Sequence, residues 1–460
     1  MIEKFADQLE AIALRTRPGA AIYLFGKLPA WVHDRLQSVR FRQTLKLAAR
    51  APFYAAKFRQ HNIDPGRISH PSQLGDLYTT SADLLEHGAE AFLVGPADTA
   101  FETTGTTSNL PKRIYFSYQE LDLMGRTSAL GLYQLGLRSE DVIVSAFDVS
   151  FWVSPAVLRT ALQYLGCFHV EAGKLPPHEF YERVKRYRPT VIFGEPSWIA
   201  RVSEIAATEG TWPVKFIFAG GENLTEETRK RVESIWQAPY YLNYGQTESF
   251  GVVGVECSMK RGYHRNDLNF IFEVAESDDD GFGELVYTTL TREVMPLVRY
   301  RSSDITRLVD EPCECGLFAK RIAKISGRCD EMIVCGMGNI SPWVFAEVLR
   351  DVPAARDEWQ VRVWPGGRCD VVELRVEVNG SNGNGSGHRL QEHVRENLRV
   401  RFPDFWNNFE MGLYEFRVEP VAPHTLRSAR KLKRVVALPA EPVLQNGARG
   451  HDALLERLVA

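Results

Sequence analysis

The stretch Phe101–Ser117 collects residue types that can hold a polyphosphate. Hydroxyl side chains crowd around one glycine, and two cations follow them. These residues are Thr103, Thr104, Gly105, Thr106, Thr107, Ser108, Lys112 and Arg113. A glycine allows a sharp turn that presents backbone N–H groups, and hydroxyls and cations add further donors to an anion. The stretch predicts a phosphate-binding loop, although the G-x-x-x-x-G-K-[ST] pattern is absent and a Ser/Thr-rich surface turn is the alternative.

Three cysteines and a histidine form a second set with recognisable chemistry. Cys257 and His264 make a C-x6-H pair, and Cys313 and Cys315 make a C-x-C turn. Three thiolates and one imidazole complete tetrahedral Zn²⁺ coordination with no open position, which is typical of a structural site. Buried cysteines and a hydrogen-bonded histidine are the alternative. We expect the remaining cysteines to be packing residues. They are Cys167, Cys329, Cys335 and Cys369.

The composition excludes several classes of protein. The chain has 460 residues, enough for two or more domains, and its 44% hydrophobic and 25% charged residues are ordinary for a globular protein. A net charge of -3 gives no basic footprint for nucleic acid. No apolar run approaches the ~20 residues of a membrane span, and the charged start does not resemble a secretory signal. We therefore expect a cytoplasmic protein with neither nucleic acid nor membrane as a partner.

Helical segments alternate with short apolar strands from residue 118 onwards. Segments 141–144, 190–193 and 214–218 are almost continuously apolar, which predicts a buried, largely parallel sheet covered by helices. Ligands bind such sheets beyond the carboxyl ends of the strands. From about Asn269 the pattern changes to strict alternation, which predicts antiparallel strands.

The predicted fold class is α/β, with two domains. Residues 1–327 should form a large N-terminal domain of mostly parallel sheets covered by helices, with an antiparallel subdomain. Residues 328–460 should form a small α+β C-terminal domain.

Four stretches in this order resemble the motifs of the adenylate-forming superfamily of acyl-CoA ligases and carrier-loading adenylation domains. They are TTGTTSNLPK at 103–112, NYGQTE at 243–248, YRSSD at 300–304 and SGRCDEMIVCGMGNISP at 326–342. Segments 51–58 and 283–308 are similar to the phenylacetate-CoA ligase branch, which also carries Cys/His pairs in the regions noted above. The resemblance covers nearly the whole chain.

The resemblance implies a two-step reaction. A carboxylate would be joined to AMP with loss of pyrophosphate, and the acyl group would then pass to a thiol, with ATP, Mg²⁺ and CoA as the small molecules required. Charge accumulates at the α-phosphate in the first step, so catalysis should rest on placed cations and hydrogen-bond donors. A homodimer is also suggested by the resemblance.

The resemblance also implies roles for individual residues. Nucleotide-binding positions are Thr104, Gly105, Thr106, Thr107, Lys112, Gly220, Gly221, Glu222, Tyr244, Asp304 and Arg328. Among them, Tyr244 should stack on adenine, Asp304 should accept both ribose hydroxyls, and Arg328 should reach ribose or phosphate. Thr247 should contact the α-phosphate and Glu248 should bind Mg²⁺. The alternatives are a turn-forming Asp304 and a solvated Glu248 at a strand-end turn.

The last implied motif lies near the C-terminus. The family's catalytic lysine bridges the carboxylate and the α-phosphate, and the matching run 427–434 offers Lys431, with Lys433 as a neighbour of equal chemistry. A solvated basic face is the alternative. Asp330 falls at the hinge about which the family reorients its C-terminal domain between the two steps. The chain departs from the family pattern at 108–110, where a second glycine is usual, so the loop should close differently over the phosphates.

Aromatic residues between the phosphate loop and Glu248 suggest an acyl pocket. The candidates are Phe147, Phe151, Trp152, Phe193 and Trp198. They can build a flat slot for an aromatic acid, or they can be ordinary core. Three functions remain open: CoA ligation of an aromatic acid, loading of the phosphopantetheine thiol of a carrier protein, and non-catalytic nucleotide binding.

Overall fold

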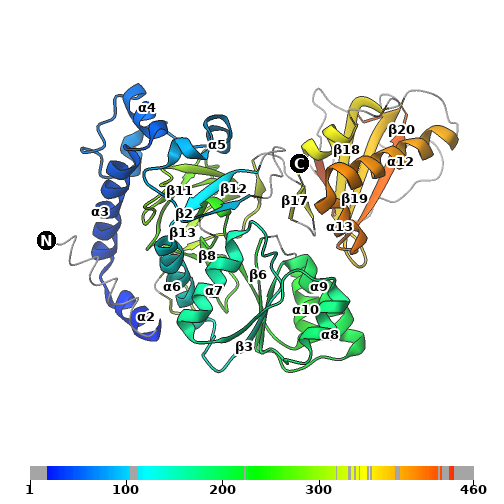
Figure 1. Cartoon of the computed structure of the whole chain (residues 1–460), viewed down its shortest axis with the longest axis horizontal. Helices are drawn as coiled ribbons and strands as arrows, with labels where there is room; N and C mark the ends of the chain where they lie inside the picture. The colour runs from blue at the N-terminus through cyan, green and yellow to red at the C-terminus, as the bar shows by residue number, and fades with distance from the viewer. Residues whose placement is uncertain are drawn as a thin grey trace. The chain divides into compact units, whose positions relative to one another are not determined.

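The chain forms two compact units in the computed structural model (Figure 1). The first comprises Met1–Glu347 with Glu410–Leu413, and the second comprises Val348–Phe409 with Tyr414–Ala460. The structure describes residues 18–439 except 104–110, 222–223, 225, 250, 318, 330–332, 336–337, 341, 350–351, 353–354, 379–383, 423–424 and 427–434. The boundary expected between residues 327 and 328 stays a prediction.

Helices and a two-stranded hairpin open the first unit. They are α2 (Pro18–Lys27), α3 (Ala30–Ala48), α4 (Pro52–Gln60), η1 (Pro71–Leu74), α5 (Ser81–His87), η2 (Ala89–Phe92), β1 (Thr99–Glu102) and β2 (Arg113–Phe116). Strands β1 and β2 pair antiparallel, and Glu102 lies opposite Arg113. Thr103 N–H then donates to the Lys112 carbonyl at 3.0 Å, and Lys112 N–H donates to Thr103 Oγ1 at 3.0 Å. The hairpin therefore holds both ends of the stretch expected to bind phosphate.

Among the described residues, nine strands form one mixed sheet in the order β13-β14-β9-β8-β7-β6-β5-β3-β4. Their bounds are β3 (Val142–Ser145), β4 (Phe168–Glu171), β5 (Val191–Gly194), β6 (Phe216–Ala219), β7 (Tyr240–Tyr244), β8 (Gly254–Glu256), β9 (Tyr263–Arg265), β13 (Leu308–Val309) and β14 (Arg321–Ile322). Strands β4, β3, β5, β6 and β7 are parallel, and the strands beyond β7 are antiparallel.

Helices cover both faces of the parallel strands (Figure 1). One side carries α6 (Tyr118–Gln134) and α7 (Val153–Leu165), and the other carries α8 (Pro177–Val184), α9 (Pro196–Glu209) and α10 (Glu226–Trp236). Side chains alternate between the two layers, as the period of two in a strand requires. Phe193 and Phe218 pack with residues of α6 and α7, whereas Ile192 and Ile217 pack with residues of α8 to α10. The α/β fold class is confirmed.

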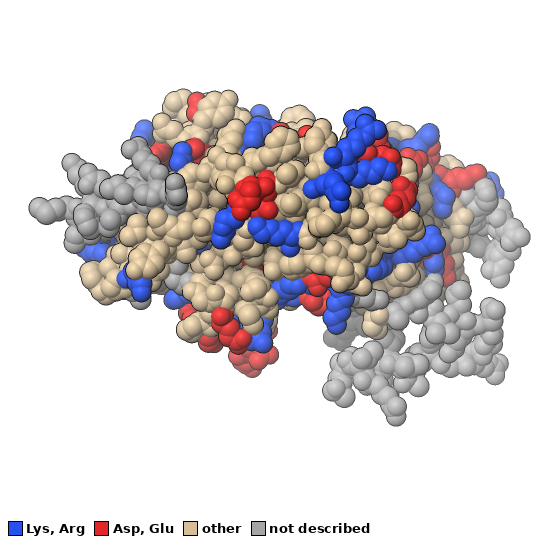
Figure 2. All heavy atoms as spheres, turned by 90° about the horizontal axis from the view of Figure 1, so that it is seen from below, with Lys and Arg blue, Asp and Glu red and all other residues tan. Residues whose placement is uncertain are grey.

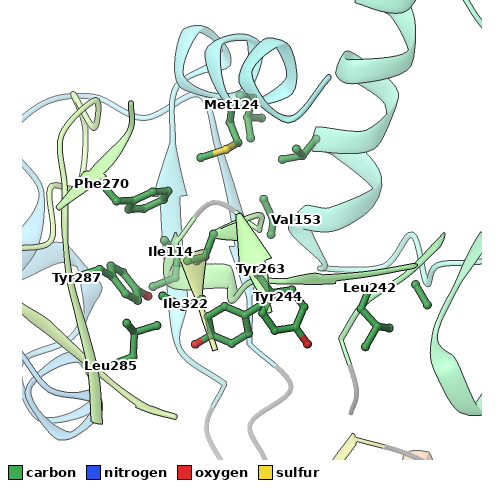
Figure 3. Packing of buried hydrophobic residues seen from close by; sticks show 14 of the residues in the cluster. Ile114, Met124, Val153, Leu242, Tyr244, Tyr263, Phe270, Leu285, Tyr287 and Ile322 are labelled. Atoms are coloured by element: carbon green, nitrogen blue, oxygen red, sulfur yellow. The ribbon is translucent and has the colours of Figure 1, made fainter. Parts of the chain in front are cut away.

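A separate antiparallel sheet has the order β10-β11-β12-β15. Its strands are β10 (Phe270–Ala275), β11 (Gly283–Thr289), β12 (Tyr300–Thr306) and β15 (Gly327–Arg328). Buried side chains of this sheet and of the larger one belong to one hydrophobic cluster, part of which Figure 3 shows. Within the larger sheet Tyr244 packs on Tyr263 with ring centroids 5.9 Å apart, and within the smaller sheet Tyr287 packs on Phe270 at 5.7 Å.

The second unit is a small α+β structure built on one sheet. Its strands are β18 (Ala355–Pro365), β19 (Asp370–Val378), β20 (Tyr414–Val421) and β21 (Val435–Ala437), in the order β20-β19-β18-β21. The helices α12 (Asn384–Arg401) and α13 (Pro403–Glu410) lie between β19 and β20 in the chain. The hairpin β16 (Ile333–Cys335) and β17 (Gly338–Ile340), followed by α11 (Pro342–Leu349), precedes β18 in the chain.

Surface charge and helix length agree with the composition. On the face drawn in Figure 2, basic and acidic side chains lie in small groups among uncharged residues. None of the helices that the structure describes has the length and apolar character needed to cross a membrane.

The turn after β7 depends on close contact between backbone segments at Gly245. A Cβ atom at this position would lie 1.2 Å from the carbonyl oxygen of Gly251. Gly251 N–H donates to the Gln246 carbonyl at 2.8 Å, and Val253 N–H donates to the Tyr244 carbonyl at 2.8 Å, so neither segment can move without breaking these bonds.

We expect Gly245→Ala to destabilise the first unit by about 3 kcal/mol, because overpacking forces the backbone segments apart. Gly95→Ala is the matched control, since a Cβ there meets nothing within 4 Å. Differential scanning calorimetry should show a lower unfolding midpoint for Gly245→Ala and an almost unchanged one for Gly95→Ala. Equal unfolding midpoints for the two variants would contradict the close approach of Gly245 to the carbonyl oxygen of Gly251.

Candidate active site

A cavity of about 220 Å³ opens in the first unit beyond the carboxyl ends of the parallel strands. Its walls include Phe147 after β3, Phe193 on β5, Phe218 on β6 and Asn243 on β7. The loops after β6 and β7 also line it, at Gly220 and Gly221 and at Gly245–Glu248. Parallel α/β sheets bind ligands at this edge because the strand-to-helix loops gather there.

Lys112 and Glu248 form a buried ion pair in the cavity wall. Lys112 Nζ lies 2.7 Å from Glu248 Oε1, and the Tyr300 hydroxyl donates to the same oxygen at 3.0 Å. Lys112 also donates to Ser81 Oγ at 2.8 Å. Lys112 lies in the hairpin immediately before β2, Glu248 lies in the short helix η3 (Thr247–Ser249), and Tyr300 starts β12. Three distant segments therefore meet at one carboxylate.

The lysine decides the charge of this carboxylate. Burial alone would raise the pKa of Glu248, but the ammonium group of Lys112 and the hydrogen bond from Tyr300 hold that pKa below its usual range. Burial, with the negative charge of Glu248 nearby, raises the pKa of Tyr300 well above its usual range, so its hydroxyl remains a donor. A buried carboxylate that is ionised at neutral pH can exchange this lysine for another cation.

Asp304 is the second buried carboxylate of the site. Its Oδ2 accepts from the Tyr244 hydroxyl at 2.6 Å and from Gln246 Nε2 at 2.7 Å, and Arg328 Nη1 lies 3.0 Å from its Oδ1. The register between β12 and β15 places Asp304 directly opposite Arg328. Burial and the Asp304 charge raise the pKa of Tyr244 well above its usual range, which keeps its hydroxyl protonated. Asp304 and Arg328 are thus brought together as a fixed pair.

The remaining nucleotide-site residues are placed as follows. Gly220, Gly221 and Thr247 line the cavity, and Thr247 Oγ1 donates to the Glu102 carbonyl at 3.5 Å. Tyr244 lies deeper, with its ring against Tyr263 and its hydroxyl on Asp304. Other expected site residues lie outside the described part of the chain. They are Thr104, Gly105, Thr106, Thr107, Glu222, Asp330 and Lys431.

Three of the five aromatic candidates for the acyl pocket line the cavity, namely Phe147, Trp152 and Phe193. The other two lie elsewhere. Phe151 adopts φ +56°, and its side chain is exposed, at 67%. Trp198 lies on α9, which covers the opposite face of the sheet; there its ring packs edge-on against Phe180 and its indole N–H donates to the Leu175 carbonyl at 3.1 Å.

Several cavity residues were not singled out by sequence reasoning. Gln246 and Tyr300 lie within the motifs NYGQTE and YRSSD, so those motifs were the signal that could have found them. Phe218 could have been found by its place at the end of an apolar strand. Ser128 and Leu132 carry no such signal, because an ordinary helix contains them.

The three cysteines and the histidine meet in space. The ligand atoms of Cys257, His264, Cys313 and Cys315 all lie within 4.8 Å of one another. His264 Nε2 is 3.2 Å from Cys315 Sγ, and Cys257 Sγ is 3.7 Å from Cys313 Sγ. His264 Nδ1 lies 2.6 Å from the Ala319 carbonyl, which makes Nδ1 the protonated nitrogen and leaves the lone pair of Nε2 facing the sulfurs. Burial lowers the pKa of His264, which favours the neutral form that binds a metal.

This donor set fits a tetrahedral zinc ion. Pairing of β9 with both β8 and β14 brings the Cys257–His264 segment beside the segment that contains Cys313 and Cys315. Three sulfurs and one imidazole nitrogen leave no position for a substrate. The cluster is separate from the cavity, since none of its four residues belongs to the cavity wall as described.

Comparison with known proteins shows which family model and which proteins this chain resembles. Residues 94–269 match the family model described as AMP-binding enzyme. The chain is 27% identical over 366 residues to phenylacetate-coenzyme A ligase of Thermus thermophilus, covering 75% of this chain and 82% of that ligase. It is 24% identical over 365 residues to phenylacetate-coenzyme A ligase of Escherichia coli, covering 75% and 83%.

Solved structures share the fold. A 2-hydroxyisobutyryl-CoA ligase in complex with 2-HIB-AMP and CoA superposes with a TM-score of 0.74 at 21% identity, covering 89% of this chain and 90% of that chain. An amide bond synthetase from Marinactinospora thermotolerans superposes with a TM-score of 0.54 at 17% identity, covering 75% and 68%.

Replacing Lys112 should reveal the free-energy cost of burying the ionised carboxylate of Glu248. We expect Lys112→Met to lower stability by about 3 kcal/mol at pH 7, because it leaves a buried carboxylate without its cation. In the variant, burial then raises the pKa of Glu248 above its unfolded value, so protonation relieves the penalty as the pH falls. In the parent protein that pKa is lowered, so the pair's contribution is present above the unfolded pKa and is lost as the pH falls through the folded pKa.

Calorimetric unfolding midpoints of parent and variant at pH 7 and pH 5 test this expectation. The difference in stability should be smaller at pH 5. Lys324→Met, which removes an exposed partner of Glu226, is the matched control and should change little at either pH. A Lys112→Met effect that is the same at both pH values would show that Glu248 does not titrate as described.

Proposed function

Since the chain belongs to the adenylate-forming superfamily, in its phenylacetate-CoA ligase-like branch, we propose that it activates an aromatic carboxylic acid with ATP and transfers the acyl group to CoA. In the first step a carboxylate oxygen attacks the α-phosphorus of ATP, and the bond to the departing pyrophosphate breaks. In the second step the CoA sulfur attacks the acyl carbon, its proton is lost to solvent, and AMP leaves. The chain is thus an acid–thiol ligase of the AMP-forming class.

The observation that carries the proposal is the composition of the cavity wall. One set of wall residues holds buried charges that suit a nucleotide, around Lys112, Glu248 and Arg328. Another set is apolar and belongs to the hydrophobic cluster between the sheet and helices α6 and α7. An acyl adenylate has the same division, because its phosphate and sugar are polar while its aryl group is not.

The polar residues in and behind the cavity wall have distinct proposed tasks. Asp304 accepts the ribose hydroxyls, and Arg328 opposite it reaches ribose or phosphate. Thr247 donates to the α-phosphate, where negative charge grows in the transition state. Tyr244 keeps its proposed place at the adenine ring, and its hydroxyl also holds Asp304 in position. The loop 104–107, Glu222 and the Gly220–Gly221 turn complete the nucleotide site.

Lys112 and Glu248 exchange partners in this proposal. Lys112 is held at the end of the phosphate loop, so the β- and γ-phosphates can compete for its ammonium group. Glu248, freed of Lys112, would hold Mg²⁺, for which a buried ionised carboxylate is a suitable ligand. The ion would supply positive charge at the phosphates.

The apolar wall supports an aromatic substrate. Phe147, Trp152, Phe193 and Phe218 contribute aromatic rings to a cavity large enough for one compact ring system. Such rings stack on an aryl acid at offset or edge-on geometry. We propose a substrate with its carboxylate near Thr247 and its ring between these side chains.

We propose a role for the C-terminal part of the chain from the family resemblance alone. Residues 328–460 would swing about Asp330 between the two steps and bring Lys431 to the carboxylate and α-phosphate. We also propose a cytoplasmic location, which follows from the composition, and a homodimer, which follows from the family resemblance. Delivery to a carrier-protein phosphopantetheine and non-catalytic binding are outcomes that the following experiment separates.

The purified protein should catalyse exchange of pyrophosphate into ATP that depends on an added aromatic acid, and it should form the CoA thioester without any added protein. Lys431→Ala should reduce the exchange at least ~100-fold while ATP binding persists, because the lysine acts on the reacting groups. Lys433→Ala is the matched control. Exchange without a CoA thioester would favour a carrier protein, and ATP binding without exchange would favour a non-catalytic role.

We propose that the Cys257, His264, Cys313 and Cys315 cluster holds a structural zinc ion. Metal analysis should give about one zinc per folded chain. Cys315→Ser should lose the zinc and lower the unfolding midpoint, because three ligands bind less tightly and the segments they join separate. Cys369→Ser, which changes a cysteine of the second unit, should retain both. A folded parent protein without zinc would disprove the site.

A further inference from the structure

Ser128 is a polar residue in the apolar wall of the cavity. It lies on α6, is 8% exposed, and lines the cavity together with Leu132 one turn later. Residues four positions apart share one face of a helix, so Ser128 and Leu132 both face the cavity. Across from them, Phe193 and Phe218 belong to the same hydrophobic cluster as Leu132.

The hydroxyl of Ser128 is not satisfied within the described part of the protein. Its Oγ is buried and has no hydrogen-bond partner there. Other hydroxyls in helices of this unit bond to the carbonyl four residues earlier, as the half-buried Thr160 on α7 does to Ala156 at 3.1 Å and the buried Ser203 on α9 does to Ile199 at 2.7 Å. Even its neighbour Thr127 donates to the Leu123 carbonyl at 3.1 Å. Ser128 alone among these four lacks this local bond.

A buried polar group without a partner is costly, so its presence in a cavity wall calls for an explanation. Helix packing does not require a serine here, because alanine fills the same space and favours a helix more. The cavity itself offers the explanation, since a bound molecule that reaches the apolar wall can supply the missing partner.

We propose that Ser128 recognises a hydroxyl group on the aromatic ring of the substrate. This inference rests on the proposed function and narrows its substrate class to ring-hydroxylated aryl acids. A serine hydroxyl can donate one hydrogen bond and accept others, so it matches a phenol in either direction. A site built to bond a substrate hydroxyl rejects the analogue without it, because the protein group is then left unpaired.

The test compares phenylacetate with the three isomeric hydroxyphenylacetates, which carry one hydroxyl on the ring, in acid-dependent pyrophosphate exchange. One isomer should exceed phenylacetate in kcat/KM by about tenfold or more. Ser128→Ala should remove most of that preference by lowering kcat/KM for the preferred isomer far more than for phenylacetate. Ser154→Ala, the same change on α7 in the same cavity wall, is the matched control and should keep the preference.

A variant that prefers the same isomer as strongly as the parent would overturn the inference while leaving the proposed function intact. If no acid supports exchange, the proposed function fails. Calorimetric titration of the parent and Ser128→Ala with phenylacetate and the three phenols then decides the inference separately. Equal affinities for all four acids would overturn it.

Folding of the variant provides an independent check. Ser128→Ala should unfold at the same temperature as the parent or higher, since it removes an unpaired buried hydroxyl and adds a better helix former. A lower unfolding temperature would show that an internal partner already satisfies the hydroxyl, and it would overturn the proposal.

Discussion

Two carboxylates, Glu248 and Asp304, are buried beside one cavity, and each must be neutralised within the protein. Burying a charge without a partner costs several kcal/mol. Each carboxylate is therefore paired with groups from segments that are distant in the sequence. Glu248 forms an ion pair with Lys112 of the hairpin and accepts a hydrogen bond from Tyr300 of β12, and Asp304 forms an ion pair with Arg328 of β15. The hairpin, the loop after β7 and the antiparallel sheet are therefore held in the relative positions that a nucleotide site needs. A ligand can also break these ion pairs, because an anionic group can compete for the lysine or arginine and a cation can compete for the carboxylate.

The second constraint is the alternation of side chains along β5 and β6. One set of residues packs under α8 to α10 and is ordinary core, whereas the other set, including Phe193 and Phe218, faces α6 and α7 and borders the cavity. The cavity is thus an incompletely filled part of a hydrophobic layer. This origin explains why its inner wall is apolar and why one unsatisfied hydroxyl there, at Ser128, stands out as a recognition group.

The Cys/His cluster performs a different task from the cavity. It links the turn after β8 to the segment between β13 and β14, where short strands of two and three residues provide few backbone hydrogen bonds. Short strands at the end of a sheet separate easily, so a bound metal would stabilise them. The site would support the scaffold that carries Tyr244 and Asp304.

The sequence alone determined the fold class, the order of the motifs and the identity of the four metal-ligand candidates, because periodicity and side-chain chemistry are properties of short segments. It could not decide which aromatic residues line the cavity. Trp198 and Phe193 are five positions apart, yet the sheet separates them onto opposite faces. The pairing of Lys112 with Glu248 and the unpaired hydroxyl of Ser128 were likewise decided by the tertiary structure, since each depends on distances between segments that only folding brings together.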